Sequence, residues 1–163
     1  MTEFQRLFLV QAQSDFLVFE ILRKTPGLPG SHALHYLQMA TEMLGKAHAW
    51  RHGPRTNTHR AFVSFLRSLA TNRQAQTQLG YEGRTENWKH LLRKSVPLAE
   101  RVEDLAPSLS PDAPNPEYPW PRIAPKAAPV EHLFEIWTEF QSAAGRSFLT
   151  LARNLFAAAD CFI

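Results

Sequence analysis

The sequence predicts an all-α protein: an antiparallel bundle of four to five helices, with a proline-rich connector before a long C-terminal helix. Alternating runs of β-branched residues are almost absent, and no Asn-Gly hairpin turn occurs. Apolar residues instead recur at three- and four-residue intervals along most of the chain. A length of 163 residues, 44% of them hydrophobic, is enough to bury a core. We therefore expect a single helical domain over residues 1–163.

Three helices are expected in the first half of the chain. The first begins near the N-terminus and ends at a segment rich in proline and glycine. Ser31 is a candidate N-cap for the second, which is expected to end near His52, before a Gly-Pro pair. Asn57 or Thr58 can cap the third helix, whose apolar residues share one face.

A fourth helix is expected over about residues 85–105, with a kink or a split near Pro97, because proline removes a helical hydrogen bond. The composition then changes, since eight of the 12 prolines fall in residues 107–129. This predicts an extended connector with polyproline II character. Tyr118 and Trp120 are large aromatic residues for a free linker, so we expect them to hold the connector against the bundle. The alternative is a proline-rich ligand for another module.

The last helix is expected over about residues 130–159 and would be the longest of the chain. Its apolar residues form one ridge at three- and four-residue spacing. Phe134, Phe156 and Phe162 lie off that ridge, which indicates a second buried surface and suggests a homodimer interface.

The composition favours a cytoplasmic protein that does not enter a membrane. Cys161 is the only cysteine, which excludes an internal disulfide and a thiolate metal cage. The first 20 residues lack the pattern of a signal peptide. No apolar run approaches the roughly 20 residues that span a bilayer.

Basic residues cluster in one part of the sequence, although the net charge is only +3. The 39 residues between Glu42 and Glu82 contain no acid, but six lysines and arginines and three histidines. Such a block predicts a basic face for a polyanion such as RNA or a nucleotide. The alternative is an ordinary solvated surface whose charges are neutralised by acids from other helices.

The segment GPRTNTHR, at the start of the third helix, is the best candidate for phosphate contact. Unpaired N–H groups and the positive end of the helix dipole favour an anion at such a position. The candidate phosphate-binding residues in and before this segment are Lys46, Arg51, Arg55, Asn57, His59 and Arg60.

Histidines are dense in residues 31–53, which raises the question of a metal site. They form two pairs at helical spacing, His32 with His35 and His48 with His52. Glu42 lies too far along the helix to complete either pair, so we expect no metal and no cofactor. Motifs for nucleotide hydrolysis, dinucleotide binding and serine hydrolysis are absent from the sequence.

The second and third helices combine polar and small residues in a distinctive order. HALHYLQMATEMLGKAHAW, residues 32–50, places His35, Gln38, Ala40, Glu42 and Lys46 in turn, and a Thr-His pair opens the third helix. This pattern resembles the HEPN family (higher-eukaryote-and-prokaryote nucleotide-binding domains), most strongly over residues 31–69. The resemblance implies a helical bundle, often dimeric, that binds RNA or a nucleotide. Many members are metal-independent ribonucleases of toxin–antitoxin and defence systems, and others are inactive binding partners.

The resemblance also implies a catalytic pair. Active members use an arginine and a histidine separated by four to six residues and paired across a dimer. The histidine moves a proton and the arginine stabilises charge on phosphorus. Arg84 and His90 match this spacing, although the arginine and histidine content would supply such a match by chance. Arg55 with His59 would be a departure from the spacing, and a chain without catalysis is the third interpretation.

A non-catalytic interaction subunit is the alternative function. In that interpretation the long last helix and the proline-rich arm bind a protein partner.

Overall fold

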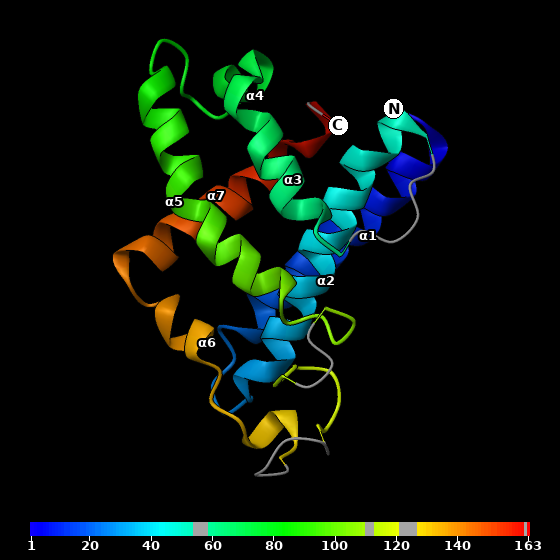
Figure 1. The fold of residues 1–163 in the computed structure, drawn as a ribbon, viewed down its shortest axis with the longest axis vertical. Coiled ribbons are helices and arrows are strands. Elements are labelled where there is room, and N and C mark those ends of the chain that lie inside the picture. The colour runs from blue at the N-terminus through cyan, green and yellow to red at the C-terminus, as the bar shows by residue number, and fades with distance from the viewer. Residues whose placement is uncertain (54–58, 110–112, 121–126, 162) are drawn as a thin grey trace.

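The structure is a computed structural model that describes the chain except residues 54–58, 110–112, 121–126 and 162. Every regular element of the described residues is helical (Figure 1). The α-helices are α1 (Glu3–Leu22), α2 (Gly30–Ala49), α3 (Ala61–Ser68), α4 (Arg73–Gln78), α5 (Thr85–Glu103), α6 (Glu135–Glu139) and α7 (Ala143–Ala158). The expected all-α bundle is confirmed, with α1, α2, α3, α5 and α7 as its longer members. No helix of the described part is long and apolar enough to cross a membrane.

α1 and α2 form a helical hairpin that makes the most extensive packing contact of the fold (Figure 1). Thr2 and Gln5 form a capping box at the start of α1. The buried apolar residues of the two helices are Leu9, Ala12, Phe16, Phe19, Ala33, Leu34, Leu37, Ala40, Leu44 and Ala47. The prediction that Ser31 caps α2 is wrong: Pro29 precedes the helix, and Ser31 is buried in its first turn. Proline has no side-chain acceptor, so α2 begins without a side-chain cap.

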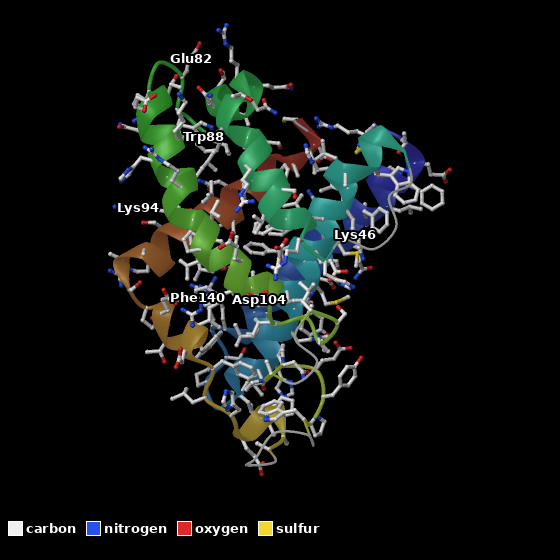
Figure 2. The ribbon with its side chains drawn as sticks, in the orientation of Figure 1. Lys46, Glu82, Trp88, Lys94, Asp104 and Phe140 are labelled. Carbon is white, nitrogen blue, oxygen red and sulfur yellow. The ribbon has the colours of Figure 1, made fainter. Side chains whose placement is uncertain are left out.

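α3 packs between α2 and α5, and α5 in turn packs on α7. α4 is a short helix that the apolar pattern does not indicate, and it begins where Asn72 Oδ1 accepts a hydrogen bond from Ala75 N at 2.9 Å. α5 runs through Pro97 as one helix rather than two. Buried Trp88 donates its Nε1–H to Leu69 O at 2.8 Å and so ties α5 to the end of α3 (Figure 2).

The prediction of one continuous helix over residues 130–159 is wrong. This region forms a 3-10 turn (Pro129–Glu131), then α6 and α7. Ser142 begins α7, because its Oγ accepts a hydrogen bond from Gly145 N at 3.0 Å. The turn before it is tight: a Cβ atom at Gly145 would lie 2.3 Å from Glu139 O. The three-four apolar spacing continues across this turn, so periodicity alone cannot reveal the break.

The aromatic residues that suggested a second surface pack within the chain itself. Phe156 is buried and stacks on Phe16 of α1, with ring centroids 4.2 Å apart. Phe134 is also buried, and Phe162 lies outside the described residues. The apolar face of α7 therefore belongs to the core.

The connector is held by only one of the two aromatic residues expected to do so. Trp120 is 4% exposed and lies edge-on to the rings of His132 and Phe134, at centroid distances of 5.2 and 6.3 Å. Tyr118, in contrast, is 53% exposed. Asn115 orders the segment that leads to Tyr118, because its Oδ1 accepts hydrogen bonds from the N–H groups of Glu117 and Tyr118.

Replacing Trp120 with alanine should lower the free energy of unfolding by about 3–5 kcal/mol, because a buried aromatic side chain is lost and a cavity remains. Tyr118→Ala is the matched control in the same segment and should change it by less than about 0.5 kcal/mol. Chemical denaturation measures both values. Equal effects of the two substitutions would contradict the assignment of Trp120 as the anchor.

Candidate functional site

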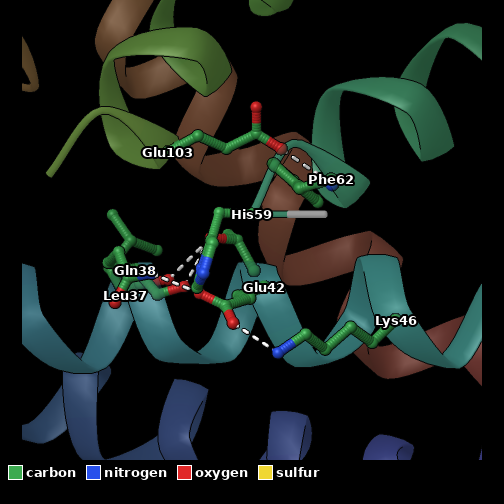
Figure 3. Close-up of polar contacts among 8 residues, drawn as sticks. Leu37, Gln38, Glu42, Lys46, His59, Phe62 and Glu103 are labelled. Carbon is green, nitrogen blue, oxygen red and sulfur yellow. Dashed lines mark hydrogen bonds and ion pairs between the residues drawn. The ribbon is translucent and has the colours of Figure 1, made fainter. Parts of the chain in front are cut away.

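Glu42 is the centre of a polar cluster at the junction of α2 and α3 (Figure 3). Its buried carboxylate accepts hydrogen bonds from Gln38 Nε2 at 2.7 Å and from Lys46 Nζ at 2.5 Å. These residues are four positions apart on α2, so all three lie on one helix face. His59, which precedes α3, places its Nδ1 3.1 Å from Glu42 Oε2, the oxygen that also accepts from Gln38, whereas Lys46 donates to Oε1. One carboxylate thus holds groups from two segments that are distant in sequence.

The charge state of Glu42 decides how the imidazole is held. Burial raises the pKa of the Glu42 carboxyl, but the hydrogen bonds and charges of Lys46 and His59 outweigh it and leave the pKa below the ordinary value. The carboxylate is therefore ionised at neutral pH and can only accept hydrogen bonds. Nδ1 of His59 must then be the donor, which leaves Nε2 of the neutral ring as the basic nitrogen. The hydrogen bonds of the described residues leave Nε2 without a partner.

A hollow of about 250 Å³ opens beside this pair. One side is formed by α2 and His59, and the other by the segment that follows α5. The lining residues are Gln38, Met39, Glu42, His59, Ala106, Pro107, Ser108, Glu117 and Tyr118. The volume is below the roughly 300–1,000 Å³ of drug-sized pockets, so the hollow fits part of a nucleotide rather than a large ligand.

Close approach of α3 to α2 brings His59 to this position. At Gly45 the two backbones touch: a Cβ atom there would lie 2.4 Å from both Ala61 C and Phe62 N. Only glycine allows this crossing without displacing the start of α3. The chain just before α3 therefore passes directly over α2, where His59 reaches Glu42.

Glu103, at the end of α5, also holds the start of α3 in place. Its buried Oε1 accepts hydrogen bonds from Phe62 N at 2.9 Å and Val63 N at 3.0 Å. α3 has no cap from its own N-cap residue, Arg60. Glu103 therefore acts as the cap of α3 from a different helix, which satisfies two of its free N–H groups.

In the part of the chain that the structure describes, three of the six lysines and arginines of the basic block pair with acids, and two of these acids come from another part of the fold. Arg60 pairs with Asp104 at 2.8 Å, and Arg67 pairs with Glu100 at 2.8 Å, so α5 and the residue after it supply both acids. Lys46 pairs with Glu42 within α2. Of the two interpretations of the block, the structure resembles the neutralised surface more than a bare basic face.

The other predicted phosphate-binding residues are not gathered into one site. Arg51 Nη2 lies 3.5 Å from the main-chain oxygen of Ile163, away from the hollow lining. Arg55 and Asn57 lie outside the described residues. Among the four predicted residues that the structure describes, Lys46 and His59 are brought together through Glu42.

Arg84 is the N-cap residue of α5 and His90 lies within the helix; both are exposed. The Arg84 guanidinium donates to Gly80 O and lies 5.4 Å from the ring centroid of Tyr81. Positions six residues apart on a helix differ by about 120° around the axis, so the two side chains do not share a face.

The remaining histidines do not converge on a common point in the described part of the chain. Nε2 of His48 lies 3.2 Å from Ser68 Oγ, and its ring lies 5.1 Å from that of Phe65. His32 is exposed. Among the described residues, no group of three or more histidine, cysteine, aspartate or glutamate side chains is arranged to hold a metal ion.

Comparison of the chain with protein-family models, curated proteins and solved structures finds no match. The HEPN resemblance therefore rests on the residues of the second and third helices quoted above.

Two features of the site were not foreseen from the sequence: the Glu42–His59 contact and the cap supplied by Glu103. The i, i+4 spacing of Gln38, Glu42 and Lys46 does signal a polar stripe on α2. A contact across helices has no such local signal.

Proposed function

We propose that the hollow beside His59 binds RNA or a nucleotide, as the HEPN resemblance implies, and that His59 is its proton-transfer residue. The Glu42–His59 pair is the observation that carries this proposal. A buried, ionised carboxylate behind an imidazole holds the ring in one orientation and one tautomer, the arrangement that orients histidine bases in unrelated hydrolases.

Tyr118 and Lys46 suit a nucleotide, although Glu117, which accepts a hydrogen bond from the Tyr118 hydroxyl, adds a second carboxylate to the lining. Tyr118 lines the hollow and exposes more than half of its surface, so its ring is available for stacking with a base. The Lys46 ammonium, bound to Glu42, offsets the carboxylate charge that would otherwise repel a phosphate.

In the catalytic form of the proposal, Nε2 of His59 takes the proton of a ribose 2′-hydroxyl. The 2′-oxygen attacks the adjacent phosphorus, and the bond from phosphorus to the 5′-oxygen breaks. The proton passes to that leaving oxygen, so the products are a 2′,3′-cyclic phosphate and a 5′-hydroxyl. The step is balanced by these atoms alone and needs no co-reactant.

Incubation of purified protein with labelled RNA in EDTA tests the proposal. Cleavage should fall at least about 100-fold in His59→Ala, the usual contribution of a general base, and by a smaller factor in Glu42→Gln. Arg84→Ala and His90→Ala are the matched controls and should retain activity. Loss in those two variants with full activity in His59→Ala would instead place the site on α5.

A binding assay tests the other form of the proposal, in which the protein binds RNA without cleaving it. A gel shift with RNA should weaken as salt rises, because phosphate contacts release counterions. Tyr118→Ala and His59→Ala should each weaken it further. Intact RNA together with no shift at high protein excess would contradict the proposed function.

A further inference from the structure

Two neighbouring residues of the connector place a carboxylate beside an aromatic ring at the hollow. Glu117 and Tyr118 both line the hollow, as His59 does. The Tyr118 hydroxyl donates a hydrogen bond to Glu117 Oε1, which holds the carboxylate at the edge of the phenol ring. A base that stacks on this ring therefore meets a carboxylate close to its own edge.

The backbone that carries this pair is held by Asn115. The Asn115 side chain is buried, at 4% exposed. Its Oδ1 accepts hydrogen bonds from the N–H groups of Glu117 at 3.0 Å and of Tyr118 at 2.8 Å, which makes a local turn of the kind that asparagine stabilises. The carboxylate and the ring are thus presented from one ordered turn, so less freedom is lost when a ligand binds between them.

The Glu117 carboxylate repels phosphate, but it suits a base that donates hydrogen bonds. A carboxylate has two oxygens with about four acceptor positions. The Tyr118 hydroxyl uses one of these positions. The remaining positions can accept two N–H groups that lie side by side, the bidentate arrangement in which charge-assisted hydrogen bonds are strong and specific. The carboxylate therefore favours a ligand with two adjacent donors.

Guanine is the RNA base that presents such a pair of donors. Its N1–H and N2–H groups lie next to each other on the Watson–Crick edge. Adenine and cytosine each present one amino group beside a ring nitrogen, whose lone pair would face the second carboxylate oxygen. Uracil presents a single N–H between two carbonyl groups. A carboxylate that contacts this edge therefore discriminates guanine from the other three bases.

We propose that Glu117 selects guanine, because its carboxylate accepts hydrogen bonds from N1–H and N2–H of a base that stacks on Tyr118. This inference rests on the proposed function, since it names the base of the RNA or nucleotide that the hollow binds. Glu117 is then the specificity residue, a role separate from proton transfer by His59.

Binding of short 2′-methoxy RNAs that differ at one position tests the choice of base. A strand of uridines with one central guanosine should bind about tenfold more tightly than the strands with adenosine, cytidine or uridine there, as is typical of a bidentate base contact. Inosine lacks the N2 amino group and should lose most of this preference. 7-Deazaguanosine keeps the Watson–Crick edge and should retain it. Fluorescence anisotropy of labelled strands measures all of these affinities.

Substitution of Glu117 tests the residue. Glu117 is exposed, so Glu117→Gln should fold as the wild type does, but its amide N–H₂ opposes a donor of guanine and should abolish the preference. Glu82→Gln is the matched control: it removes the same charge from an exposed glutamate outside the hollow lining and should keep the preference. Tyr118→Ala should weaken binding of all four strands alike.

The outcomes separate this inference from the function on which it rests. Equal binding of all four strands by the wild type overturns the guanine assignment and leaves RNA binding intact. A preference for guanine that survives Glu117→Gln also overturns the assignment. Binding of none of the strands contradicts the proposed function, and the inference with it.

Discussion

Gly45→Ala is expected to lower the free energy of unfolding by about 3 kcal/mol or more. On helix propensity alone the same substitution would stabilise α2 by up to about 1 kcal/mol. The new Cβ would lie 2.4 Å from two backbone atoms of α3, which cannot rotate away as a side chain could. The sign of the change therefore separates packing from propensity.

Chemical denaturation of Gly45→Ala, next to His32→Ala as a control, measures this effect. His32 is exposed on the same helix, so its replacement should change the free energy of unfolding by less than about 0.5 kcal/mol. Crowding at residue 45 should also displace His59 and reduce RNA binding. A stabilised Gly45→Ala protein would show that α2 and α3 do not cross at this point.

Glu103→Ala is expected to cost about 2–4 kcal/mol, because two buried N–H groups of α3 lose their acceptor. α3 has only eight residues and would be marginal alone, so its position depends on this contact. Glu103→Gln keeps an acceptor oxygen and should recover much of the loss. Equal losses in both variants would contradict the capping role.

The pH dependence of the two glutamates should have opposite signs. Burial raises the pKa of Glu103, so its contribution to stability is fully present below the ordinary pKa and decreases as the pH rises through the raised value. For Glu42 burial is outweighed by Lys46 and His59, and the pKa is lowered. Its stabilisation is present above the ordinary pKa and is lost as the pH falls through the lowered value.

Glutamine mimics a protonated carboxyl group at both positions. From about pH 3 to 8, the difference in stability from wild type should move in favour of Glu103→Gln and against Glu42→Gln; the change for Glu42 falls at the acid end of this range. Denaturation at several pH values measures both differences. Two differences that change in the same direction would contradict this assignment of the carboxyls.

Much of the fold follows from local patterns in the sequence. The positions of α1, α2 and α5 are predicted by apolar periodicity and by the proline and glycine residues between them. The break between α6 and α7 is not, because Ser142 and Gly145 create it within an unbroken apolar ridge. The sequence shows that α1 is apolar on most sides, but it does not tell which of these side chains the fold leaves exposed.

The candidate site could be predicted only in part. Glu42, Lys46 and His59 stood out as residues of interest, but their common contact depends on a helix crossing set by Gly45 and Glu103. The acid-free block suggested a basic face, whereas Asp104 and Glu100 lie beside it in space though far away in sequence. Tertiary pairing of charges has no local signature.

Nuclear magnetic resonance of the histidine rings gives the most direct test of the proposed site. The probe is a short RNA with 2′-methoxy groups, which cannot be cleaved, added to protein with ¹⁵N-labelled histidine. The account predicts saturable changes in the ring signals of His59, with those of His32 and His90 unchanged. Changes at His90 with none at His59, or no change at any ring, would contradict it.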